Sequence, residues 1–154
     1  MAYRKARRLL GTGVLSVSVL VPAVPAAGSM NTAIAQRVNQ ARLQHGLPRL
    51  RLTPALSDAA AAHCGEMLAG QGLSHGALKQ RLRRYLAAGS YGETIAWMPI
   101  GAASGPGAVV RAWMNSPPHR AVLLSRSFRR IGVAAKRGRI GGQRGTSFTI
   151  DVAS

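Results

Sequence analysis

Acidic residues are scarce in this chain, which has only 4 Asp and Glu against 21 Lys and Arg in 154 residues. The resulting net charge of +17 excludes a charge-balanced surface and favours contact with an anionic polymer or an anionic lipid surface. The basic residues are spread along the chain, and the densest group, residues 79–84, is interpreted as a solvated helix face. Because no nucleic-acid-binding motif accompanies these charges, we expect no specific nucleic-acid partner.

Cysteine is almost absent, since Cys64 is the single one, and an intramolecular disulfide is therefore excluded. Many small secreted domains depend on disulfides, so this chain must be held together by packing alone. Cys64 lies in an Ala-rich stretch with helical spacing, and we expect it to be a buried apolar residue rather than a reactive thiol.

Long apolar runs are also lacking, with one exception near the N-terminus. Residues 1–26 have a positive n-region, an apolar stretch over 9–20 and the small residues Val24-Pro25-Ala26, which is the layout of a secretory signal peptide. An uncleaved anchor and twin-arginine export through Arg7-Arg8 are the alternatives, although the run is short for a membrane span. Cleavage after Ala26 would leave 17 basic and 4 acidic residues, a net charge of +13. We expect an extracellular or periplasmic protein without a transmembrane segment.

The remaining chain is long enough for one domain with one core. Hydrophobic spacing and turn residues predict helices over 31–44, 54–69, 77–88, 108–114 and 119–124, and strands over 93–97, 128–136 and 146–152. A short extended connector is predicted at 50–52, a loop at 98–107 and a turn at 137–145. Helices come early and strands late, which indicates an α+β fold with helices packed on an antiparallel sheet.

Three short segments each place one ionisable residue beside apolar or aromatic residues: 73–75, 91–97 and 112–120. They stand in order within a longer frame formed by residues 38–42, 46–50, 56–60 and 128–133. Over about residues 30–152 this set resembles the CAP superfamily of cysteine-rich secretory, antigen 5 and pathogenesis-related proteins, in its compact bacterial form (the SCP domain). The resemblance implies an α-β-α sandwich, with a central antiparallel sheet between helical layers.

The resemblance also implies a cleft lined by two histidines and, in many members, two glutamates. His75 and His119 match the histidines and Glu93 matches the first glutamate, whereas Ser116 stands where the second glutamate would be. Two further departures are Thr94, where Asn is usual, and Arg130, where an acidic residue is frequent.

These residues are candidates for both metal binding and catalysis. His75 and His119, either alone or together with Glu93, would be ligands of a divalent ion such as zinc, with a position left open for water or substrate. The alternative is a hydrogen-bonded polar cluster without metal, and no other cofactor is predicted. In a hydrolase, Glu93 would act as general base or orient a histidine that does.

Other polar residues and the tryptophans have simpler interpretations. Ser116 is a possible nucleophile, but Ser before Pro is the usual start of a helix. His63 and Glu66 share a helix face and are interpreted as a surface or boundary pair. Trp97 and Trp113 would either line the cleft or pack in the core, and core packing is the commoner role.

The sequence therefore predicts an exported module that binds a ligand of the cell envelope or the extracellular medium through the cleft and a basic surface. Cell-wall polymer, anionic lipid and an apolar small molecule are the ligands considered. The alternatives are a weak hydrolase, peptidase-like or dependent on a divalent metal, and a structural or interaction protein with a vestigial cleft.

Overall fold

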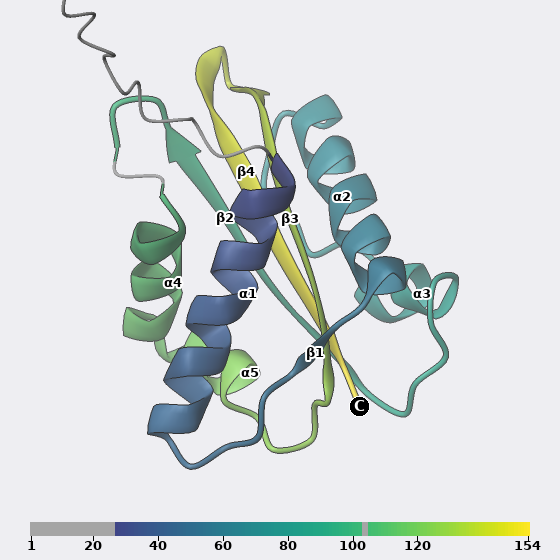
Figure 1. The fold of residues 1–154 in the computed structure, drawn as a ribbon. Coiled ribbons are helices and arrows are strands. Elements are labelled where there is room, and N and C mark those ends of the chain that lie inside the picture. Colours follow the sequence, from purple (N-terminus) through teal and green to yellow (C-terminus); the bar gives the residue numbers. More distant parts are fainter. Residues whose placement is uncertain (1–26, 103–104) are drawn as a thin grey trace, which may run out of the picture.

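The computed structural model describes residues 27–102 and 105–154, so the predicted signal peptide lies outside the described residues. The described residues form five helices and four strands, whose arrangement can be followed in Figure 1. In chain order they are α1 (Ala27–Gln44), β1 (Arg51–Leu52), α2 (Pro54–Ala69), α3 (Leu78–Arg83), β2 (Tyr91–Pro99), α4 (Pro106–Asn115), α5 (Pro117–Leu123), β3 (Arg130–Ile140) and β4 (Gln143–Ala153). None of the helices in the described ranges is both long and apolar enough to cross a membrane.

The sheet has the strand order β1-β3-β4-β2. Strand β4 pairs antiparallel with both β3 and β2, whereas the two-residue β1 pairs parallel with β3. The sheet is therefore mixed, and the predicted connector at 50–52 adds a short strand to its edge. Helices α2 and α3 cover one face and α1, α4 and α5 cover the other, which confirms the predicted α+β sandwich (Figure 1).

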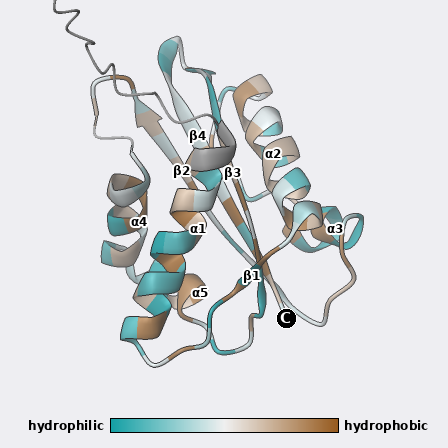
Figure 2. Cartoon of the chain, viewed as in Figure 1, coloured by the Kyte–Doolittle hydropathy of each residue, from teal (hydrophilic) through white to brown (hydrophobic). Residues whose placement is uncertain are grey.

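The face of the sheet toward α1, α4 and α5 carries the main apolar core. Alternate residues of β3 and β4, such as Val133 and Ile150, are fully buried there against Ile34 of α1 and Val109 of α4. Burying such side chains contributes roughly 1.5–3 kcal/mol each. Figure 2 shows apolar colouring along the middle of the sheet and hydrophilic colouring at the tip of the β3–β4 hairpin.

The opposite face is packed much more tightly against α2. A Cβ atom added at Gly132 would lie only 2.0 Å from the backbone carbon of Leu56, so α2 rests directly on the backbone of β3. Small residues of α2, including Ala59 and Ala60, permit this approach. Because α2 is so close, the polar residues that alternate with the apolar core residues along β4 are buried too: Ser147, Thr149 and Asp151.

Cys64 belongs to this tightly packed layer. It is fully buried, as predicted, and its sulfur lies 3.3 Å from Oγ1 of Thr149 and 3.5 Å from the carbonyl oxygen of Ser147. Burial raises the pKa of the Cys64 thiol, which keeps it protonated and unreactive.

The structure corrects two predicted elements and shifts several boundaries. The predicted turn at 137–145 is wrong, because β3 continues to Ile140 and β4 begins at Gln143. Only Gly141 and Gly142 form the connection, both with positive φ angles, as a two-residue hairpin turn requires. The predicted helix over 77–88 is also too long, since α3 ends at Arg83. The predicted helix over 54–69 matches α2 at both ends.

The close approach at Gly132 generates a stability prediction. Gly132→Ala must push α2 away from β3, and we expect a loss of about 3 kcal/mol or more in the free energy of unfolding. Gly89→Ala is the matched control, because its added Cβ would meet only an ordinary contact at 3.5 Å. Urea titration of both variants measures the difference, and equal stability of the two would contradict the packing described.

Candidate functional site

The candidate site lies at the β2 edge of the sheet, on the face that carries α2. Cross-strand pairing aligns Glu93 of β2 with Asp151 of β4, and Asp151 with Gly132 of β3. Paired residues point to the same side of a sheet, so both carboxylates lie under the α2 side. The missing side chain at Gly132 and the small residues of α2 leave room for them.

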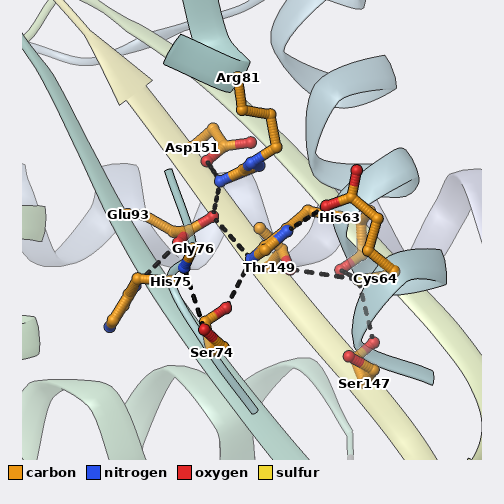
Figure 3. Close-up of polar contacts among 12 residues, drawn as sticks. His63, Cys64, Ser74, His75, Gly76, Arg81, Glu93, Ser147, Thr149 and Asp151 are labelled. Carbon is orange, nitrogen blue, oxygen red and sulfur yellow. Dashed lines mark hydrogen bonds and ion pairs between the residues drawn. The ribbon is translucent and has the colours of Figure 1, made fainter. Parts of the chain in front are cut away.

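Glu93 is the centre of a buried polar cluster (Figure 3). Its side chain has no exposed surface, and His75 Nδ1 lies 2.8 Å from Oε1. The other oxygen, Oε2, accepts a hydrogen bond from Arg81 Nη2 and lies 3.6 Å from His63 Nε2. One carboxylate thereby joins β2 to α2, to α3 and to the loop that connects those helices.

His63 corrects one sequence interpretation. The hydrogen bond between its Nδ1 and Glu66 is present, at 2.9 Å, but the histidine is buried rather than at the surface. Its Nε2 lies 2.8 Å from the carbonyl oxygen of Ser74. His63 therefore holds the backbone of the loop that carries the next residue, His75.

Arg81 is a second correction, because it was assigned to the solvated face of residues 79–84. Its side chain is only 10% exposed and forms an ion pair with Glu93. The signal was available in the sequence, since Arg81 follows Leu78 by three residues and precedes Leu82, which places it on the apolar side of the helix. The other charged residues of that segment are exposed.

Asp151 is the third member that sequence reasoning missed. Both of its carboxyl oxygens are buried, and its carboxyl group interacts with that of Glu93. The nearest cation is Arg81, whose Nη2 lies 3.7 Å from Oδ1. The alternation of residues along β4 could have indicated this position, because it places Asp151 on the same face of the strand as Thr149.

Burial in this layer disfavours the charged forms of both carboxyl groups. It raises the pKa of Glu93 to about 7, although Arg81 opposes the shift. Burial and the neighbouring Glu93 raise the pKa of Asp151 to about 8. Near neutral pH, Asp151 therefore keeps its proton, and the charge of Arg81 is available to balance Glu93.

His75, on the loop after α2, and His119, on α5, lie near enough for the charge of His75 to affect His119. His75 is 53% exposed although its Nδ1 contacts Glu93, so Nε2 is left for an outside partner. His119 of α5 is half-buried, and its pKa is lowered by burial and by the neighbouring positive charge of His75. His119 belongs to α5, which contacts β2 from the opposite side of the sheet.

Comparison with known proteins identifies the family of this chain. The sequence model of the cysteine-rich secretory protein family, CAP, matches residues 35–150. This chain belongs to the CAP family. The match spans all three segments from which the resemblance was drawn, so the predicted family is confirmed.

Relatives and solved structures support the same CAP fold. An uncharacterized membrane protein of Bacillus subtilis, YlbC, is 32% identical over 105 residues, which are 64% of this chain and 29% of that protein. An extracellular SCP-domain protein of Bacillus anthracis has 26% identity and a TM-score of 0.65, over 85% of this chain and 45% of that chain. A cysteine-rich secretory protein of Staphylococcus aureus has 17% identity and a TM-score of 0.70, over 85% of this chain and 40% of that chain, and shows the fold alone.

The other three candidate cleft residues of this CAP domain are two tryptophans and a serine, and each has a different environment. Trp113 is 1% exposed and donates a hydrogen bond from Nε1 to the carbonyl oxygen of Ile95 at 3.2 Å, so it packs in the core. Trp97 is half-buried on β2 and covers Gly145. Ser116 occupies the N-cap position of α5, as expected, although its side chain makes no capping hydrogen bond.

The candidate metal ligands His75, His119 and Glu93 are not arranged as a three-ligand metal site. Within residues 27–102 and 105–154 there is no group of three or more His, Cys, Asp or Glu side chains arranged to hold an ion. Glu93 is engaged by His75 and Arg81, so it orients His75 rather than facing a shared ion. A metal at His75 and His119 stays a prediction, and it would need further ligands from water or substrate.

The buried carboxyl groups predict a pH-dependent stability. Because their pKa values are raised from 4.5 and 3.8, the stability linked to their protons is fully present below about pH 4 and is lost as the pH rises through about 8. We expect Asp151→Asn to flatten this decline, which reaches up to about 1.4 kcal/mol per pH unit for one retained proton. The measurement is urea unfolding between pH 5 and 9.

The matched control is Asp58→Asn, which removes an exposed carboxylate on α2. It should keep the pH dependence of the parent protein. An Asp151→Asn variant with the parent's slope would show that Asp151 is ionised in the folded protein.

Proposed function

We propose that this CAP protein is an exported module that binds a ligand of the cell envelope or extracellular medium at the His75/His119 cleft. The observation that carries the proposal is the state of His75. Its ring is held by the buried Glu93 through Nδ1, yet more than half of the side chain is exposed. A side chain that is fixed on one side and open on the other is preorganised for a partner.

Export is supported by the signal-peptide pattern of residues 1–26 and by the solved relatives. One is described as an extracellular protein of Bacillus anthracis. Another, with 19% identity, a TM-score of 0.66 and coverage of 80% of this chain and 90% of that chain, is described as an outer surface protein of Borrelia burgdorferi. The relatives compared extend well beyond this domain in most cases, so their complete activities are not carried over.

The chemistry of the cleft favours a ligand with a hydrogen-bonding or anionic group. Two imidazoles at one opening can donate to a carboxylate or phosphate when protonated, and a neutral imidazole can accept from a hydroxyl group. The rest of the described surface has a large excess of cations, which attracts anionic ligands over a longer range.

Binding to isolated bacterial cell walls tests the proposal. We expect His75→Ala and His119→Ala each to weaken cosedimentation at least tenfold, because each removes one side of the opening. His45→Ala is the matched control. His45 is exposed at the end of α1, so its substitution should leave binding to cell walls unchanged.

The result also separates the structural alternative. If the double variant His75→Ala/His119→Ala bound cell walls like the parent protein but lost much of its stability, the histidines would only support the fold. Loss of binding with an unchanged unfolding midpoint would establish the cleft as the binding site.

A second candidate, a hydrolase, is favoured by the same Glu93–His75 contact. A carboxylate that accepts from Nδ1 fixes the imidazole tautomer that leaves Nε2 as a base toward a bound water or hydroxyl group. In this arrangement Glu93 would be a positioning residue.

Turnover of peptide and ester substrates tests this candidate. Glu93→Gln should lower kcat at least a hundredfold with little change in KM, because it removes the anion that orients His75. Full turnover in Glu93→Gln would remove the contact from any mechanism.

A further inference from the structure

Five arginines gather at the β1 end of the sheet, far from the hairpin tip. They come from two segments, with Arg49 and Arg51 in the first and Arg126, Arg129 and Arg130 in the second. Strand pairing brings the segments together, because Arg51 is the cross-strand partner of Arg130 and its backbone N–H donates to the carbonyl oxygen of Arg129 at 2.9 Å. We call these five residues the arginine edge.

A sixth arginine, which is buried, holds the loops that lead into the two segments. Arg42 of α1 has no exposed surface, and its guanidinium donates only to backbone carbonyl groups. The acceptors are Pro48 at 2.9 Å, just before the first segment, and Leu123 at 2.7 Å and Ser125 at 3.0 Å, just before the second. Arg42 thereby fixes both loops and adds another positive charge beneath them.

Acidic side chains do not neutralise this edge. Within the described part of the chain, the ion pairs involve only Glu66, Glu93 and Asp151, all on the α2 side of the molecule. Arg129 and Arg130 donate instead to backbone oxygens of Arg126 and Ser154. Like charges placed opposite each other on neighbouring strands destabilise a sheet. A bound anion would remove that cost.

The side-chain chemistry favours phosphate groups carried on a polymer. Arginine presents a rigid fork of donors that matches phosphate oxygens, and four of the five arginines are exposed. Leu52, which follows Arg51 on β1, is a large apolar side chain with 41% exposure. An edge with so little apolar surface can follow a charged chain but offers little to insert into a bilayer.

We propose that the arginine edge is a second binding surface, separate from the histidine cleft, for a phosphate-bearing polymer of the cell envelope. The proposal rests on the export included in the proposed function, but not on the cleft. Repeated phosphates along one polymer would engage the two arginine segments together, and the contact would be strongly dependent on salt.

Calorimetric titration with purified poly(glycerol phosphate) at several salt concentrations tests the proposal. The test variant is Arg49→Gln/Arg51→Gln/Arg126→Gln, because these side chains are exposed. We expect affinity to fall at least tenfold. The slope of log affinity against log salt concentration should become shallower by about 2, since three phosphate contacts are lost.

The control variant is Lys136→Gln/Arg137→Gln/Arg144→Gln. It removes an equal number of positive charges near the hairpin tip, at the other end of β3, where all three residues are exposed. It should lose less than threefold in affinity. Equal losses in both variants would overturn the proposal in favour of a general charge effect. Tighter binding to phosphatidylglycerol vesicles or to duplex DNA than to the polymer would also overturn it.

Cleft variants keep this test separate from that of the proposed function. His75→Ala should bind poly(glycerol phosphate) like the parent protein, because His75 belongs to the cleft and not to the arginine edge. Loss of polymer binding in that variant would merge the two sites and contradict a separate surface.

Discussion

The buried carboxylate of Glu93 is the constraint on which the candidate site depends. An unpaired carboxylate under α2 would be strongly destabilising, so the fold must supply cations and hydrogen-bond donors around it. Arg81 from α3 and His75 from the preceding loop contact its two oxygens directly. In meeting that requirement, the chain fixes α3, the loop after α2 and the ring of His75 in one arrangement.

The two faces of the sheet differ in what they bury, and only one of them carries the candidate site. One face buries aliphatic and aromatic side chains against α1, α4 and α5, and this contributes most of the hydrophobic stabilisation. The other face is covered by a small-residue helix at close range, which leaves space for a line of polar side chains rather than a second large core. Without the tight contact at Gly132, water would reach the carboxylates and their pKa values would return toward ordinary ones.

Much of this fold could be predicted from the sequence because its signals are local. Thr53-Pro54 and the glycines after residue 69 define α2, and the apolar alternation in β4 follows Phe148 and Ile150. The family resemblance brought His75, Glu93 and His119 together, which no local spacing does. The hairpin turn was predicted too long because exposed arginines at the ends of β3 and β4 carry no strand signal.

The buried partners of Glu93 were missed for a different physical reason. Arg81 stands among basic residues, and composition alone favours solvent exposure for it, whereas His63 lies between alanine and cysteine. Their burial follows from a long-range requirement of a carboxylate on β2, and Asp151 enters the cluster only through strand register. Such pairings depend on tertiary packing, which a single sequence encodes only through faint periodicity.

This cluster explains why one histidine can be both ordered and available. His75 is anchored to a buried group, so a ligand meets a ring whose orientation is already set and loses less conformational entropy on binding. His119 lies on α5 in the opposite layer and is influenced by the charge of His75. The arginine edge at the β1 side would add a separate, charge-driven contact with the same envelope.

Nitrogen-resolved NMR of the His75 ring at pH 8, in the parent protein and in Glu93→Gln, measures whether the buried carboxylate orients the ring. We expect the parent's neutral ring to carry its proton on Nδ1, hydrogen-bonded to Glu93, and we expect Glu93→Gln to shift the ring toward the Nε2–H tautomer common for free imidazole. An Nε2–H tautomer in the parent, unchanged by Glu93→Gln, would contradict the claim that the buried carboxylate orients His75.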